Sequence, residues 1–168
     1  MRKPRFLALP RPRVSPEAFV VCLAATVEPG QAAGLTSAVV ARAAKAGPRA
    51  GTVVLALAGA VDVGLVEALC SLQEELRSLG TCLRLVVVPQ GPRQQLREQA
   101  ASAPGTSLAI HPSVRSAVLA AYAARLGPGV VTAEVRATLS APAEPVHLPP
   151  RAATGEQDAR QEVVRGPG

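Results

Sequence analysis

Apolar residues along this chain form short continuous runs that alternate with segments of helical periodicity. Runs of strand length occupy residues 18–25, 52–57, 82–88 and 106–110. After the second run, leucines recur at steps of four and three, at Leu65, Leu69, Leu72, Leu76 and Leu79. This spacing predicts an amphipathic helix with a continuous apolar face. Weaker helical patterns cover residues 31–46 and 92–101 and the segment that begins at Ser113. The alternation predicts an α/β fold built from right-handed β-α-β units.

Residues with turn and capping chemistry separate these predicted elements. Gly47 and Pro48 end the first helix, and Gly80 stands where a left-handed C-cap is expected after the leucine-rich helix. Asp62 and Ser113 each precede a helical pattern and are expected to cap it through their side-chain oxygens.

The composition divides the chain into three parts. Residues 1–17 form a basic N-terminal arm with a possible edge strand at 6–9, and residues 18–126 form the folded domain. Residues 127–168 are rich in Pro, Ala and Gly, and we expect a mostly disordered tail there, with one further strand at 130–139.

The charge distribution argues against a nucleic-acid-binding surface. Five of the 18 basic residues fall within the first 13 positions, so the remaining chain is almost neutral, with 13 basic against 12 acidic residues. Aromatic side chains that stack on bases are nearly absent, since the chain has two Phe, one Tyr and no Trp. We expect a core of Val, Leu and Ala and no nucleic-acid partner.

Cysteine and histidine residues give no pattern typical of a metal site. Cys22, Cys70 and Cys82 are scattered in apolar contexts without a CxxC motif, and His111 and His147 match no common zinc spacing. The apolar stretch near the start is too short for a signal peptide, and no run is long enough to cross a membrane. We therefore expect a cytoplasmic protein with reduced thiols, no metal and no cofactor.

The stretch GAVDVG, residues 59–64, lies where α/β proteins cradle phosphate groups. A Walker-type loop continues with Lys and then Ser or Thr, but Leu65 and Val66 occupy these positions. Glu28 is the only other acidic residue in a strand-to-helix loop that is expected near Asp62. Two carboxylates without a neighbouring His, Lys or metal ligand do not indicate an enzyme.

Between about Phe19 and Ala121 the sequence resembles the STAS domain, the fold of bacterial anti-sigma-factor antagonists. The resemblance rests on the order of the elements and on residues Ala25, Thr26, Glu28, Asp62, Gly64, Leu65, Gly80, Leu83, Leu85, Pro89, Pro112 and Ser113. It implies a mixed β-sheet of four to five strands packed against about four helices.

The resemblance also implies a function in binding rather than catalysis. Such domains bind an anti-sigma factor kinase, which inactivates them by phosphorylating a serine after the turn's aspartate. Here Val63 follows Asp62, so this turn has no phospho-acceptor hydroxyl. We expect the partner to contact the edge formed by Glu28, Asp62, Val63, Gly64 and Glu67. The alternative is a small-molecule or nucleotide-binding α/β domain that uses the same loops, and the sequence leaves the oligomeric state open.

Overall fold

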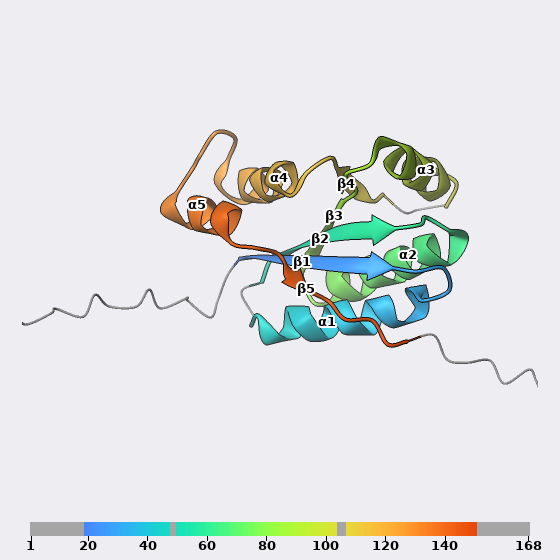
Figure 1. Cartoon of the computed structure of the whole chain (residues 1–168). Coiled ribbons are helices and arrows are strands. Elements are labelled where there is room, and N and C mark those ends of the chain that lie inside the picture. The colour runs from blue at the N-terminus through green and yellow to red at the C-terminus, as the bar shows by residue number, and fades with distance from the viewer. Residues whose placement is uncertain (1–18, 48–49, 104–106, 151–168) are drawn as a thin grey trace, which may run out of the picture.

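The computed structural model describes residues 19–47, 50–103 and 107–150 (Figure 1). The basic arm, the edge strand expected at residues 6–9 and the last 18 residues of the expected tail lie outside the described residues.

One parallel β-sheet of five strands forms the centre of the molecule. The strands are β1 (Val20–Val27), β2 (Thr52–Gly59), β3 (Cys82–Val86), β4 (Ala109–His111) and β5 (Glu144–Pro145). They lie in the order β4-β3-β2-β1-β5, and every pairing is parallel. The predicted α/β class and strand number are confirmed. Within the described residues all strand pairings are parallel, including that of β5 with β1, whereas the resemblance implied a mixed sheet.

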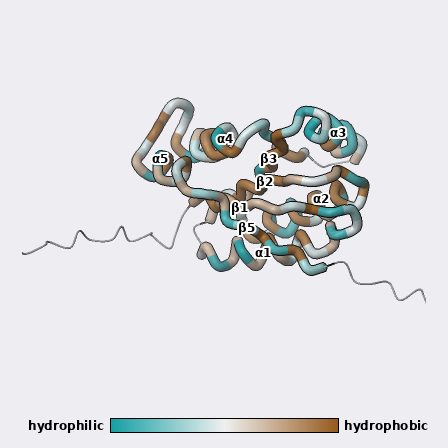
Figure 2. Tube along the Cα trace, viewed as in Figure 1, coloured by the Kyte–Doolittle hydropathy of each residue, from teal (hydrophilic) through white to brown (hydrophobic). Residues whose placement is uncertain are grey.

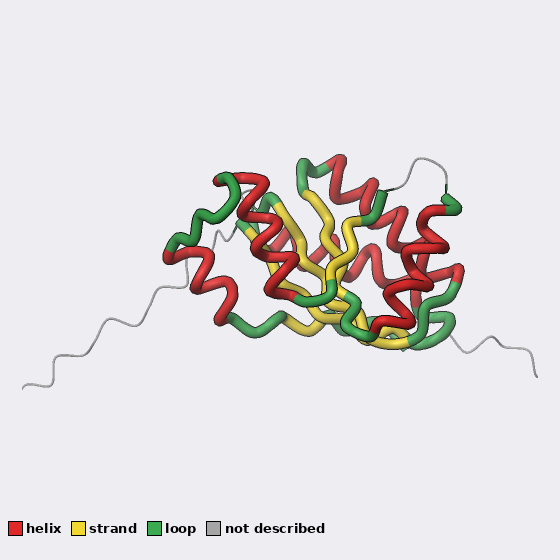
Figure 3. Tube along the Cα trace, turned by 90° about the horizontal axis from the view of Figure 1, so that it is seen from above, coloured by secondary structure: helices red, strands yellow, loops and turns green. Residues whose placement is uncertain are grey.

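Helices cover both faces of this sheet (Figure 3). They are η1 (Ala32–Gly34), α1 (Leu35–Lys45), α2 (Val63–Ser78), α3 (Gln90–Ala101), α4 (Val114–Leu126) and α5 (Ala133–Ser140). The buried residues of α1, α2 and α3 share one apolar cluster with the sheet, and those of α4 and α5 share a second. Among the described residues, no helix has both the length and the apolar character that a membrane crossing requires.

The two cores explain why so few aromatic residues suffice. In the first core, Leu23 and Leu55 of the sheet meet Leu69, Leu72 and Leu76 of α2, and all five are fully buried. Four leucines of the predicted stripe, Leu65, Leu69, Leu72 and Leu76, are therefore buried against the sheet, whereas the fifth, Leu79, follows α2 and is 59% exposed. Figure 2 shows the hydrophobic residues concentrated along the central strands. Aliphatic side chains that interdigitate at crystal-like density provide the main stabilisation.

The predicted caps are present at both helices. The Leu65 N–H donates to Oδ1 of Asp62 at 2.7 Å, and the Ser116 N–H donates to Oγ of Ser113 at 3.1 Å. Gly80 follows Leu79, the C-cap of α2, and its φ of 73° is the left-handed conformation that favours glycine at this position. Local sequence signals therefore set the limits of α2 and α4.

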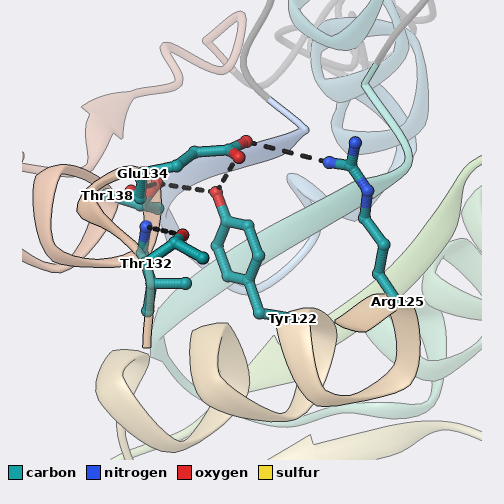
Figure 4. A network of polar contacts seen from close by, with 6 residues as sticks. Tyr122, Arg125, Thr132, Glu134 and Thr138 are labelled. Carbon is teal, nitrogen blue, oxygen red and sulfur yellow. Dashed lines mark hydrogen bonds and ion pairs between the residues drawn. The ribbon is translucent and has the colours of Figure 1, made fainter. Parts of the chain in front are cut away.

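The expectation of a strand at residues 130–139 is wrong. Thr132 accepts a hydrogen bond from the Val135 N–H at 3.3 Å and starts α5, whose Val135 is completely buried. The Tyr122 hydroxyl of α4 donates to Oε1 of Glu134 at 3.2 Å and lies 3.0 Å from Oγ1 of Thr138 (Figure 4). These contacts fix α5 on α4, so the folded domain continues past the boundary expected at residue 126.

A short strand after α5 extends the sheet at its β1 edge. β5 pairs with Leu23 and Ala24, and the Val146 N–H donates to the Ala24 carbonyl at 2.7 Å. Glu144 forms an ion pair with Arg42 of α1. Residues 127–150 of the expected disordered tail are thus attached to both faces and one edge of the sheet.

Gly59 ends β2 in a conformation that other residues rarely adopt. Its φ is 117°, and a Cβ atom added there would collide with the carbonyl oxygen of Val27 on the neighbouring strand. The close approach of the two backbones at the ends of β1 and β2 therefore requires glycine.

We expect Gly59→Ala to lower the free energy of unfolding by about 2 kcal/mol, because strain at positive φ adds to the collision with Val27. Gly64→Ala is the matched control, since a Cβ there would meet only Oδ1 of Asp62 at 3.5 Å. That change in the first turn of α2 is expected to stabilise the chain by about 0.5 kcal/mol. Urea unfolding of both variants measures the difference, and equal effects would contradict the assignment.

Candidate functional site

The parallel register brings the ends of β1 and β2 to the same edge of the sheet. Val27 pairs with Gly59, so the turns that follow, residues 28–31 and 60–62, leave the sheet side by side. The carboxyl edge of a parallel sheet is where such folds place their binding residues. This edge carries all five residues predicted for partner binding.

A groove lies beside these turns, between the η1–α1 segment and α2. Its volume is about 610 Å³, and it is lined by Gly30, Ala32, Ala33, Thr36, Asp62, Gly64, Glu67, Ala68, Ser71 and Glu75. Most of these side chains are small, which leaves space between the two helices. The hydroxyl of Thr36 donates to the Ala68 carbonyl at 3.2 Å and joins the helices across the groove.

The groove is acidic. Asp62, Glu67 and Glu75 line it, and none of its lining residues is Lys, Arg or His. Glu67 and Glu75 are exposed, whereas Asp62 is half-buried because it caps α2. Carboxylates gathered without basic neighbours create a negative potential that attracts cationic groups.

The structure brings three of the five predicted residues into this groove and leaves two beside it. Asp62, Gly64 and Glu67 line the groove. Val63 lies next to it with its side chain 65% exposed. Glu28 is exposed in the β1–η1 turn, where its N–H donates to Oε1 of Gln31 at 3.3 Å, and it does not line the groove.

Sequence reasoning missed the groove itself. Its walls come from alanines and glycines of two helices, and such residues give no signal of a binding surface in the sequence. The only available sign was the weak apolar stripe in residues 31–46, where η1 carries the small side chains of Ala32 and Ala33.

A second cavity lies on the opposite face of the same sheet edge. Its volume is about 630 Å³, and its lining includes Ala24, Ala56 and Ala58 of the sheet, Pro89 after β3 and His147 after β5. Its lining residues include no Asp, Glu, Lys or Arg, and His147 is the one histidine among them. The cavity is thus mostly apolar and offers no fixed charge to a phosphate group.

The cysteines and histidines of the described chain do not assemble into a reactive or metal-binding cluster. Cys22, Cys70 and Cys82 are free thiols, and burial raises the pKa of Cys22, which keeps it protonated and unreactive. No group of three or more His, Cys, Asp or Glu residues within the described ranges has a geometry that would hold a metal ion.

Comparisons of the chain with protein-family models, with curated proteins and with solved structures give no match. The function must therefore be inferred from the geometry of the chain itself.

Asp62 combines a structural role with its place in the groove, and the two can be separated by substitution. We expect Asp62→Ala to lower the free energy of unfolding by about 1 kcal/mol, because the Leu65 N–H loses its partner. Asp62→Asn keeps the capping oxygen and should retain most of that stability. Chemical denaturation of the two variants tests this expectation, which would be wrong if both lost stability equally.

Proposed function

We propose that this chain is a cytoplasmic, non-enzymatic regulatory domain that binds a partner protein through the acidic groove between η1–α1 and α2. The groove is the observation on which the proposal rests, because Asp62, Gly64 and Glu67 all line it and its volume is about 610 Å³. A partner that fits it presents a basic segment, because the three lining carboxylates need cationic partners when water is removed.

The residues around the groove support an interface rather than a catalytic centre. Val63 exposes an apolar side chain at its margin, and interfaces combine such apolar anchors with a polar rim. Asp62 is already engaged as the cap of α2, which favours a positioning role over acid–base chemistry. Three free thiols are typical of a reducing compartment and support a cytoplasmic location.

An anti-sigma factor kinase is the partner class that the STAS resemblance suggests. From β1 to α4 the elements follow the order on which that resemblance rests, strand–helix–strand–helix–strand–helix–short strand–helix, and α5 and β5 come after it. The proposed complex differs from that of other antagonists in its regulation, because residues 59–66 contain no Ser, Thr or Tyr.

Glu67→Lys is expected to weaken partner binding about tenfold or more, because it reverses one charge of the groove. Isothermal titration against the purified anti-sigma factor kinases of the source organism measures the affinity. Glu74→Lys is the matched control on the same helix, since Glu74 lies outside the groove lining and contacts Arg77 at the surface. Binding that is equally weakened by both variants, or by neither, would contradict the proposed surface.

Incubation with the same kinase and ATP should leave the affinity of this chain for the kinase unchanged. The turn has no hydroxyl that accepts a phosphate, so the usual switch by added negative charge is lost. Mass spectrometry together with titration checks this outcome. The sharpest contradiction would be a phosphate on Ser71, which lines the groove, accompanied by a loss of binding.

A further inference from the structure

The carboxyl ends of β3 and β4 form a second strand-end site, away from the acidic groove. β3 and β4 are neighbours in the sheet, but the helices that follow them pack on opposite faces. Leu96 of α3 belongs to the first core, and Val118 of α4 belongs to the second. Where neighbouring parallel strands send their connections to opposite faces, the chain opens a crevice in which α/β proteins bind ligands.

Three basic side chains from three different elements meet at the end of β4. An Nη atom of Arg84 in β3 lies 3.2 Å from Nε2 of His111 at the end of β4. Arg97 of α3 reaches the same strand, where it donates to the Ile110 carbonyl at 3.3 Å. Arg97 is exposed, and Arg84 and His111 are half-buried, so solvent reaches the cluster.

The cluster has no carboxylate to balance it within the described chain. The ion pairs of the described residues involve Arg42, Arg77 and Arg125, and neither Arg84 nor Arg97 forms one. Burial lowers the pKa of His111, and the charges of Arg84 and Arg97 lower it further. The neutral imidazole then accepts the Arg84 hydrogen bond at Nε2 and keeps a proton at Nδ1 that it can donate.

The start of α4 adds to the positive potential. Ser113 caps this 13-residue helix with a neutral hydroxyl, and its first turn contains no acidic residue. The free N–H groups and the dipole of such a helix end attract anions. The helix end strengthens a site that the converging side chains already define.

A further polar atom of the cluster is unsatisfied. The Nε of Arg84 is buried and has no hydrogen-bond partner in the described structure. A guanidinium that lacks full hydrogen bonding in a half-buried position is costly unless an anion offsets its charge.

We propose that the side-chain cluster at the carboxyl ends of β3 and β4, formed by Arg84, Arg97 and His111 beside the start of α4, binds the phosphate group of a small molecule. Guanidinium groups suit this ligand because their planar forks donate two hydrogen bonds to phosphate oxygens. This site is independent of the partner-binding groove, since the two share no residue.

Titration of the full chain with inorganic phosphate at low salt, followed by ¹H–¹⁵N NMR, tests the proposal. Saturable shifts are expected for the backbone amides of residues 110, 111 and 113–116, and adenosine monophosphate should produce the same pattern. Arg84→Gln and Arg97→Gln are each expected to weaken phosphate binding about tenfold, because each removes charge-assisted hydrogen bonds. Arg77→Gln is the matched control, since that arginine lies on α2 and pairs with Glu74; it should leave binding unchanged.

Two further variants keep the proposal falsifiable if Arg84→Gln fails to fold. Arg84→Lys retains the charge without the planar fork and should bind phosphate several-fold more weakly than the natural chain. His111→Gln removes the imidazole and should also weaken binding. The proposal is overturned if phosphate changes the amide chemical shifts across the whole surface or if no chemical-shift change saturates. It is also overturned if Arg77→Gln weakens phosphate binding as much as the variants of Arg84, Arg97 and His111.

Discussion

The eight-residue parallel pairing of β1 with β2 is the constraint on which the remaining architecture depends. It runs without interruption from Val20 and Thr52 to Val27 and Gly59, and it buries Leu23 and Leu55 completely. Because side chains alternate between the faces of a strand, a slip by one residue would move these leucines to the opposite face. The same register sets the two following turns side by side and so creates the groove between η1–α1 and α2. Gly59 permits the closest approach of the two backbones at that end.

The sequence predicts those parts of the fold that depend on local chemistry. The capping oxygens of Asp62 and Ser113 act within one helical turn and appear in the structure as expected. The leucine spacing of α2 is also borne out from Leu65 to Leu76, but not at Leu79, which follows the helix and is exposed. The α5 segment was misread because VVTAEVRATL alternates apolar and polar residues like a strand, while Thr132 and Glu134 gave the competing signal of a helix start. The burial of Val135 against α4 favours the helix over the strand. This contact between two elements is not visible in a local sequence pattern.

The candidate sites are harder to predict, because they join residues that are distant in the sequence. Asp62 and Glu67 lie close together in the sequence, at the start of α2. The opposite wall of the groove, formed by Ala32, Ala33 and Thr36, comes from the η1–α1 segment. Arg84 and His111 are 27 positions apart and meet only through the pairing of β3 with β4. Their approach depends on the order of strands in the sheet, which the alternation of helices and strands leaves open. The near-neutral charge of the chain beyond its first 13 residues also hides a separation of acidic and basic surfaces.

The two capped helix starts explain why one strand end suits an anion and the other does not. At α2, the cap is the carboxylate of Asp62, which already places a negative charge on the free N–H groups. Glu67 lies on the first turns of the same helix and adds a second negative charge, so this end repels phosphate and attracts cations. At α4, the cap is the hydroxyl of Ser113, and Arg84 of β3 and Arg97 of α3 contact the end of the strand that precedes this helix. Two capped helix starts, each following a parallel strand, thus have opposite electrostatic potentials. Part of the difference comes from the cap itself, which is a charged Asp at α2 and a neutral Ser at α4.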